Sequence, residues 1–327
     1  MNKWLKIGFF ICIAQCSSLV YADKKLLNTA LARNFIDDLV KKEHMQRELV
    51  EHALRQAEFR QDIIDKMDKP YESKPWDVYA QLFLTADRVN KGAEFWKKNK
   101  KTLKFAEKHY GVPAQVIVSI LGVETYYGQR QGDTRVIDAL TTLAFYYPKR
   151  ADYFQYELKE YLKMCQQYNI KPEALVGSYA GAIGQGQFMP GSYRRWAVKF
   201  NGTGAPDIIN NSDDAIVSVA NYLQQHGWQS QQLVAQPAKL TSGPYKNIIP
   251  NLKKATYSYH DLVHFGVSPV SAKWFHPNEV GFLDLNVTQG HEYWIGYPNF
   301  YVILTYNSSP LYGLAVYLLS ESIATNV

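Results

Sequence analysis

The chain has 327 residues, of which 46% are hydrophobic, 14% aromatic and 20% charged. This composition predicts a folded protein with a substantial core, built as one large domain or two closely packed ones. The formal charge of +6 is spread along the chain, and no block of Lys and Arg indicates nucleic-acid binding. The mild positive charge is compatible with an anionic polymer as substrate.

The first 22 residues are typical of an export signal. Lys3 and Lys6 precede a short apolar stretch over 7–14, which is too short to span a bilayer, and Val20 and Ala22 offer a small-residue cleavage site before Asp23. Loss of the two lysines lowers the formal charge from +6 to +4. A rival cleavage before Cys16 resembles a lipoprotein signal, but Gln15 is a poor fit directly before the cysteine. Cleavage after Ala22 leaves Cys165 alone, so no disulfide framework can form within the chain.

Helical patterns dominate the rest of the chain in order. We expect helices over 28–67, from 86 to about 108 with Thr85 as cap, over 138–147, 149–168 and 213–226, and from Pro310 to about 323 with Ser309 as cap. The sequence pattern changes over about 231–306, where runs such as 280–287 and 300–306 predict strands separated by Gly, Pro and Asn. The predicted fold class is therefore mainly α (α+β), with a small β-rich part.

The stretch 113–128, PAQVIVSILGVETYYG, predicts a buried helix that begins at Pro113 and stops at Gly128. One carboxylate, Glu124, interrupts its apolar surface and lies in the last turn, where the helix dipole presents partial negative charge. Apolar neighbours and the dipole both disfavour ionisation, so both should raise the pKa of Glu124. A carboxyl group that stays protonated near neutral pH is suited to act as a general acid.

A second informative stretch, 177–193, reads GSYAGAIGQGQFMPGSY and contains five glycines. They predict tight turns and a backbone that other groups approach closely. No Lys-Ser/Thr pair follows and no strand clearly precedes, which argues against a phosphate-binding loop. A purely structural turn is the remaining alternative.

Together, GVETYYG and the GSYAGAIGQGQFMP that follows some fifty residues later closely resemble the lytic murein transglycosylase B family. The resemblance extends from about Trp76 to the C-terminal helix. It includes FWKKNKKTLKFAEKHYGVP, DALTTLAFYYPKRADYF, SVANYLQQHGW and GYPNFYVILTYN. The resemblance implies a lysozyme-like core that holds a peptidoglycan strand in a cleft, with an α-helical subdomain beside it.

The resemblance also implies roles for individual residues. Glu124 matches the family's sole catalytic acid/base, and Arg150 matches a basic residue at the rim of the cleft. Positions that line the cleft are matched by Tyr79, Ser178, Gln187, Phe188, Met189, Tyr222, Tyr301 and Tyr306. Tyr and Trp rings suit sugars, because they are flat and apolar with a hydrogen-bonding edge.

The expected activity is cleavage of the β-1,4 bond between N-acetylmuramic acid and N-acetylglucosamine. Ordinary glycosidases need two carboxylates, whereas the family mechanism uses Glu124 alone and closes the muramoyl C6 hydroxyl on C1 to give a 1,6-anhydro product. Asp133 and Asp138 have no assignable place by sequence. A muramidase with an unrecognised second Asp, and an inactive peptidoglycan-binding scaffold, remain as alternatives.

One part of the family pattern is broken. Relatives often carry an EF-hand-like calcium loop at the stretch that matches 199–213, and calcium prefers oxygen ligands at alternate loop positions. Here those positions hold Lys199, Asn201, Thr203 and Ala205. We therefore expect no calcium, no other metal and no cofactor. Asp213 and Asp214 nearby are explained as helix N-terminal residues.

The expected organisation is a signal peptide over 1–22, an N-terminal helical segment over 23–75 and a catalytic region over 76–327. We expect a soluble monomer in the periplasm of a Gram-negative bacterium, with a lipoprotein anchored through Cys16 as the alternative. Its expected partners are peptidoglycan glycan strands and proteins of cell-wall synthesis or remodelling.

Overall fold

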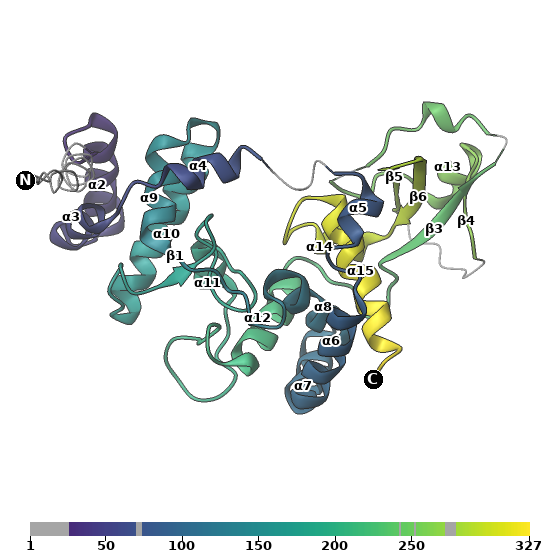
Figure 1. Cartoon of the computed structure of the whole chain (residues 1–327), viewed down its shortest axis with the longest axis horizontal. Helices are drawn as coiled ribbons and strands as arrows, with labels where there is room; N and C mark the ends of the chain where they lie inside the picture. The colour runs from purple at the N-terminus through teal and green to yellow at the C-terminus, as the bar shows by residue number, and fades with distance from the viewer. Residues whose placement is uncertain (1–25, 70–73, 242, 252, 272–278) are drawn as a thin grey trace, which may run out of the picture. The chain divides into compact units, whose positions relative to one another are not determined.

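The computed structural model describes residues 26–69, 74–241, 243–251, 253–271 and 279–327. Helices predominate, as predicted (Figure 1). The chain forms two compact units: one joins Met1–Asp68 with Asp133–Ala182, and the other joins Lys69–Gly132 with Ile183–Val327. The first unit is therefore made of two separate stretches, whereas the division into 23–75 and 76–327 stays a prediction. Within the described ranges, no helix is long and apolar enough to cross a membrane.

The first unit is helical. It contains α2 (Ala30–Glu43), α3 (Arg47–Gln56), α4 (Gln61–Met67), α9 (Val136–Tyr146), the 3-10 turn η2 (Pro148–Arg150) and α10 (Ala151–Tyr168). Strands β1 (Thr134–Arg135) and β2 (Val176–Gly177) pair antiparallel. Glu43 at the end of α2 pairs with Lys159 and Lys163 of α10, and these two ammonium groups lower the pKa of Glu43 to about 2. The expected helix over 28–67 is divided, because His44 adopts the left-handed conformation with φ 55°.

The second unit is organised around α8 (Ala114–Thr125), whose residues are almost all buried. Packed against α8 are α6 (Ala86–Lys98), α7 (Lys100–Tyr110), α12 (Ser212–Gln225) and α15 (Pro310–Ala324). Ser119 of α8 donates to the carbonyl of Val316 in α15 at 2.6 Å, so a buried polar group is satisfied where the two helices touch. Short helices α5 (Trp76–Ala80), α11 (Pro190–Trp196) and α14 (Pro298–Ile303) complete this part.

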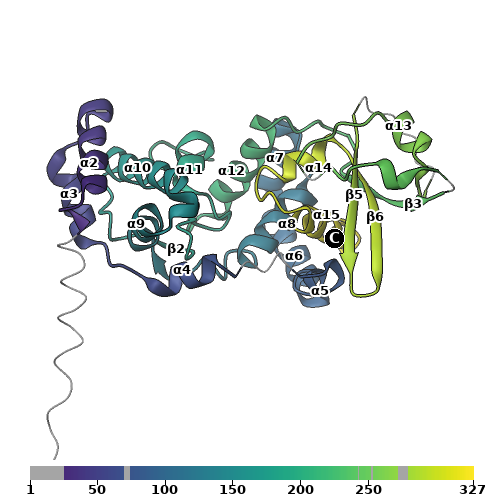
Figure 2. The same ribbon diagram turned by 90° about the horizontal axis from the view of Figure 1, so that it is seen from above.

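The β-rich part of the second unit is a four-stranded antiparallel sheet in the order β4-β3-β6-β5. Its strands are β3 (Ala235–Leu240), β4 (Val267–Pro269), β5 (Gly281–Val287) and β6 (Gly290–Gly296), accompanied by η3 (Tyr245–Asn247) and α13 (Tyr259–His264). Figure 2 shows β5 and β6 as a hairpin. A small core that includes Leu262, Val280, Phe282 and Ile295 packs within this part.

Two predicted elements of the second unit are wrong in type or extent. The run 300–306 is predicted as a strand, but helix α14 covers its first part, because Pro298 occupies the first helical turn. A buried apolar run has no periodicity that distinguishes a helix from a strand. The single helix over 86–108 is broken at Asn99, whose side chain donates to the carbonyl of Phe95 at 2.8 Å. Thr85 does cap α6, whereas Ser309 at the start of α15 makes no side-chain cap bond.

The segment before α12 is closed around Asp214, which is fully buried. The Asp214 carboxylate accepts hydrogen bonds from the backbone N–H groups of Phe200 and Asp207, at 2.9 and 2.7 Å. The ammonium of Lys199 lies 3.1 Å from the same carboxylate. Lys199 therefore supplies the positive charge that the buried carboxylate needs. Among the residues the structure describes, no group of three His, Cys, Asp or Glu side chains could hold a metal ion.

Lys199→Met should lower the free energy of unfolding by about 1–3 kcal/mol, because it leaves the buried Asp214 carboxylate without its cation. The loss is limited because the ion pair is only partly shielded from water. Thermal unfolding measures this loss, and Lys98→Met, which removes an exposed lysine from α6, is the matched control. Wild-type protein should melt at the same temperature in millimolar calcium and in chelator. A calcium-dependent rise of several degrees, which native-state binding produces, would show that this segment holds the ion.

Candidate active site

Glu124 lies in the last turn of α8, and its side chain is partly buried. The residues before it in the helix are buried from Val116 to Gly122. Burial raises the pKa of Glu124 to about 7, as the sequence predicted. A carboxyl group with this pKa is present in both protonation states near neutral pH, so it can give up a proton and take one back.

The Glu124 carboxyl group is hydrogen-bonded to a tyrosine of the C-terminal helix. The hydroxyl of Tyr312, on α15, donates to Glu124 Oε1 at 2.7 Å. This bond stabilises the ionised form and lowers the pKa of Glu124, but the effect of burial is larger. Tyr312 is itself buried, and its own pKa is raised by that burial and then by the charge of Glu124. The tyrosine therefore stays a hydrogen-bond donor while the carboxyl group changes state.

The end of α8 is fixed by an unusual turn. Tyr126 and Tyr127 both adopt left-handed backbone conformations, with φ 54° and 61°, which side chains of this size rarely adopt. The Tyr127 ring lies where a Cβ at Gly122 would be, and its hydroxyl donates to the carbonyl of Arg88 at 2.7 Å. The Arg88 guanidinium in turn donates to the carbonyl of Gly122. This carbonyl, two residues before Glu124, also accepts from the backbone N–H of Tyr126 at 3.1 Å, so a buried cation is held at the negative end of α8.

The glycine-rich stretch forms a tight hairpin from Ile183 onward, in the part that belongs to the second unit. Ile183 and Phe188 pair in both directions, at 2.8 and 2.9 Å, and Gln187 between them has φ 50°. A Cβ at Gly184 would lie 2.6 Å from the carbonyl oxygen of Ile208, so only glycine fits there without movement. The hydroxyl of Thr125, next to Glu124, donates to the carbonyl of Gln185 at 2.7 Å. The hairpin is therefore attached to the end of α8 that carries Glu124.

Three aromatic residues form a cluster beside this hairpin. The rings of Phe188, Tyr222 and Tyr306 lie 4.8–5.9 Å apart between centroids. Tyr306 donates to the carbonyl of Gly186 at 2.5 Å, and Tyr222 donates to the carbonyl of Thr305 at 2.6 Å. The pKa of Tyr306 is raised by burial and by the charge of Glu124, which places this tyrosine within electrostatic reach of the carboxyl group.

The other predicted residues of this unit differ in whether they interact with the surroundings of Glu124. Tyr79 on α5 acts electrostatically on Tyr312, so it belongs to the same surroundings. Gln187 donates through its amide to the carbonyls of Gln131 and Gly184, at 3.2 and 3.0 Å. Met189 precedes α11 as its N-cap, and Tyr301 donates to the carbonyl of Asn251 at 2.9 Å. No described contact joins either of these two to Glu124.

Ser178 and Arg150 lie in the first unit. The Ser178 hydroxyl accepts from the backbone N–H groups of Ala180 and Ala182, at 3.3 and 3.1 Å. Arg150 is exposed just before α10, with its guanidinium 4.3 Å from the centre of the Tyr153 ring. Their roles in the cleft stay predictions.

Sequence reasoning missed Tyr312 and Arg88. Tyr312 is 188 residues from Glu124 along the chain, and a tyrosine in an apolar helix carries no signal of its partner. Arg88 sits among charged residues at the start of α6, where an exposed position is the ordinary expectation. A buried helix that ends without Lys or Arg in its last turn, as α8 does, was the available hint that a cation must come from elsewhere.

Comparison with known proteins agrees with this geometry. The model of the transglycosylase SLT domain matches residues 28–321. Membrane-bound lytic murein transglycosylase B of Escherichia coli (strain K12) is 40% identical over 309 residues, which cover 91% of this chain and 83% of that protein. The crystal structure of soluble lytic transglycosylase SltB1 from Pseudomonas aeruginosa in its catenated form has a TM-score of 0.85 at 38% identity, covering 91% of this chain and 98% of the other.

A third relative carries a ligand. The structure of SltB3 from Pseudomonas aeruginosa in complex with NAG-anhNAM-pentapeptide has a TM-score of 0.76 at 27% identity, covering 89% of this chain and 78% of that one. The match of the domain model spans most of the chain, and the identity of 40% to the Escherichia coli protein extends over most of both chains. The fold is thus that of the lysozyme-like lytic transglycosylases, and the chain belongs to the SLT-domain family of lytic murein transglycosylases, which are lyases that act on peptidoglycan.

Proposed function

We propose that Glu124 is the one acid and base with which this transglycosylase cleaves the β-1,4 bond between N-acetylmuramic acid and N-acetylglucosamine. The observation that carries the proposal is a carboxyl group of pKa about 7 that accepts a hydrogen bond from Tyr312. Protonated Glu124 gives its proton to the leaving O4 oxygen as the C1–O4 bond breaks. The resulting carboxylate takes the proton of the muramoyl C6 hydroxyl as the C1–O6 bond forms, so no water is consumed and Glu124 returns to its starting state.

The single-carboxylate mechanism is supported by what sets the pKa of Glu124. Burial and Tyr312 are its causes, and no second carboxylate among the described residues contributes. Glycosidases that use two carboxylates hold them within about 10 Å of each other. Asp138 is already engaged, because it pairs with Arg135 and accepts from the backbone N–H of Glu58. The pKa of Glu124, set by burial and Tyr312 alone, favours transglycosylation over a muramidase.

Substrate binding is proposed for the residues around this carboxyl group. Tyr79, Phe188, Tyr222 and Tyr306 offer ring faces and hydroxyl edges of the kind that suit sugars. Gln187 and Met189 come from the same hairpin, and Tyr301 from α14. Ser178 and Arg150 are included on the resemblance alone. The ligand that we propose is a peptidoglycan glycan strand, of which NAG-anhNAM-pentapeptide in SltB3 is a fragment-sized example.

We propose that the protein works as a soluble monomer in the periplasm, without a cofactor and with no nucleic-acid partner, alongside other proteins of cell-wall remodelling. The signal sequence, the cleavage sites and Cys16 lie outside the described residues. The Escherichia coli relative is named as membrane-bound. A lipoprotein anchored through Cys16 is therefore the alternative that intact-mass analysis of the exported protein would reveal.

Glu124→Gln should abolish cleavage while the protein stays folded, because the change removes the transferable proton and keeps the shape of the side chain. Mass spectrometry of digested sacculi measures the outcome: wild-type products should be lighter by one water per cut than reducing-end products. Glu94→Gln, at an exposed position on α6, is the matched control and should retain full activity. Substantial turnover by Glu124→Gln, or products that contain the water, would contradict the mechanism.

The pH dependence of cleavage should follow the protonation of Glu124. The first step needs the protonated form, so kcat should fall as the pH rises through about 7, the pKa of this carboxyl group. Glu124 should cause no loss of kcat as the pH falls from 7 to 5, since the carboxyl group becomes fully protonated over that range. Initial rates on soluble glycan fragments across this range test the direction of the change in kcat. A rate that keeps rising well above neutrality would show that another group is the general acid.

Tyr312→Phe should move the falling limb of that profile to higher pH. The phenyl ring keeps the packing but removes the bond that lowers the pKa of Glu124. Because a hydrogen bond to a charged group contributes about 1.5 kcal/mol or more, the step that forms the carboxylate should slow by roughly tenfold. Tyr110→Phe alters another buried tyrosine of this unit and is the control. An unchanged pH profile in Tyr312→Phe would show that the bond has no role.

A further inference from the structure

One short run of the chain is strongly basic, although the formal charge of the whole chain is spread over its length. Residues 97–108, KKNKKTLKFAEK, contain six lysines and one carboxylate, Glu107. They form the end of α6 and most of α7, on either side of the corner at Asn99. All six lysine side chains are exposed, and we call them the lysine surface: Lys97, Lys98, Lys100, Lys101, Lys104 and Lys108.

The lysine surface lacks the carboxylates that accompany lysines elsewhere in the protein. Lys41 of α2 pairs with Asp37 at 3.3 Å, and Lys159 of α10 pairs with Glu43 at 3.1 Å. No described carboxylate forms an ion pair with any member of the lysine surface. Like charges that lie one helical turn apart repel each other. This surface therefore favours an anionic partner.

The start of α7 places lysines where they do not stabilise the helix. Lys100 and Lys101 occupy its first turn, which contains no acidic residue. The helix dipole presents partial positive charge at this end, so cations there are unfavourable. Lys97 and Lys98 lie in the last turn of α6, where the dipole favours them. Residues that break a local stability rule without a compensating contact are typical of functional surfaces.

The packing of α7 determines which side carries the charge. Leu103 and Ala106 are buried in α7, which packs against α12 and α8. Lys100, Lys104 and Lys108 recur at every fourth residue, so they form one exposed stripe roughly 12 Å long. Figure 1 shows α7 at the outer edge of the second unit. The lysines are thus presented on the outside of a helix.

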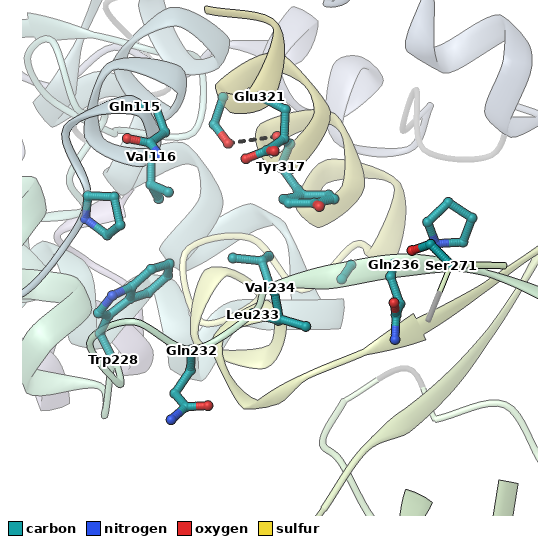
Figure 3. Close-up of a pocket in the computed structure, with 14 residues that line it drawn as sticks. Gln115, Val116, Trp228, Gln232, Leu233, Val234, Gln236, Ser271, Tyr317 and Glu321 are labelled. Atoms are coloured by element: carbon teal, nitrogen blue, oxygen red, sulfur yellow. Dashed lines mark hydrogen bonds between the residues drawn. The ribbon is translucent and has the colours of Figure 1, made fainter. Parts of the chain in front are cut away.

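A pocket elsewhere in this unit has no comparable charge. The pocket at the start of α8 has a volume of about 230 Å³, and its lining includes Trp228, Tyr317 and Glu321 but no lysine or arginine (Figure 3). An anion would therefore meet no basic side chain there. The basic groups lie on open surface instead, which fits a broad anionic partner better than a small enclosed ligand.

Phe105 lies among these lysines and distinguishes between anionic partners. Its side chain is 43% exposed, and among the described phenylalanines it alone is classed with the exposed residues. His109 stacks on its ring at 5.2 Å between centroids, and Phe200 meets it at a steep angle at 5.1 Å. A strongly hydrated polyanion gains little from an apolar ring, whereas the interface of a bilayer takes up Phe beside Lys.

We propose that the lysine surface, with Phe105 among its members, docks the protein reversibly on a bilayer that contains anionic phospholipid. The lysines are attracted to the negative surface, and each strengthens binding by roughly fivefold. The Phe105 ring enters the headgroup region. This docking is independent of the role of Glu124 and of any acyl chain on Cys16.

The experiment is sedimentation of the exported protein with vesicles of phosphatidylcholine, either alone or mixed with phosphatidylglycerol. Every protein compared carries Cys16→Ala, so that no acyl chain on this residue contributes. Binding should require phosphatidylglycerol. It should also fall as the ionic strength rises from about 0.1 to about 1 M, because the screening length shrinks from about 10 to about 3 Å. Absence of binding, equal binding to both kinds of vesicle, or binding that salt leaves unchanged would contradict the proposal.

The triple variant Lys100→Gln, Lys101→Gln, Lys104→Gln should weaken binding to the anionic vesicles by at least about tenfold. It should melt at no lower temperature than the starting protein, because two of the changes remove cations from the start of α7. Phe105→Ser should weaken binding severalfold at the same salt concentration. Unchanged binding by the triple variant would overturn the docking site.

The matched control removes three exposed lysines from the β-rich part, through Lys239→Gln, Lys253→Gln and Lys254→Gln, and should bind vesicles as before. Equal losses in the two triple variants would show that only net charge matters, which contradicts a defined surface. Purified sacculi test the other anionic partner. A lysine-surface variant that loses affinity for sacculi but keeps it for vesicles would show that this surface binds the cell wall instead.

Discussion

The structure of the second unit depends on the burial of one carboxyl group at the end of one apolar helix. A carboxylate in such surroundings is costly unless it is paired, so it takes up a proton instead. Tyr312 offsets part of this cost by donating to the carboxyl group, while Arg88 and Ser119 hold the surrounding helices through the carbonyls of Gly122 and Val316. None of these contacts supplies a full counter-charge to Glu124, which is why its pKa stays near 7 rather than falling.

The same contacts explain how the turn after Glu124 keeps its shape. Two consecutive tyrosines in the left-handed conformation are strained, and such strain persists only where the surroundings enforce it. Tyr127 is enclosed against Gly122 and bonded to Arg88, while Thr125 is bonded to the glycine-rich hairpin. The hairpin, the aromatic cluster of Phe188, Tyr222 and Tyr306, and the carboxyl group are thus positioned by one connected set of buried contacts.

The sequence predicted the parts of this site that are local. The apolar run with one carboxylate near its end was enough for α8 and for the direction of the pKa of Glu124, and the glycines were enough for a tight turn. Hydrophobic periodicity gave the wrong element at 300–306, because a run that is buried on all sides shows no periodicity. It also missed the helix end at Asn99, where one side-chain hydrogen bond ends a helix although the hydrophobic pattern goes on. The contact between Tyr312 and Glu124 could not be predicted, since it depends on α15 packing against α8 from far along the chain.

The central claim is that Glu124 is protonated near neutral pH in the resting enzyme, and it is tested most directly by observing the carboxyl group itself. Carbon-13 NMR of protein labelled at the glutamate side-chain carboxyls, with the Glu124 signal assigned by its absence in Glu124→Gln, gives the pKa without reference to turnover. We expect that signal to titrate near pH 7. A midpoint at the ordinary value of about 4.5 would contradict the account, because the carboxyl group would then have no proton to give at neutral pH.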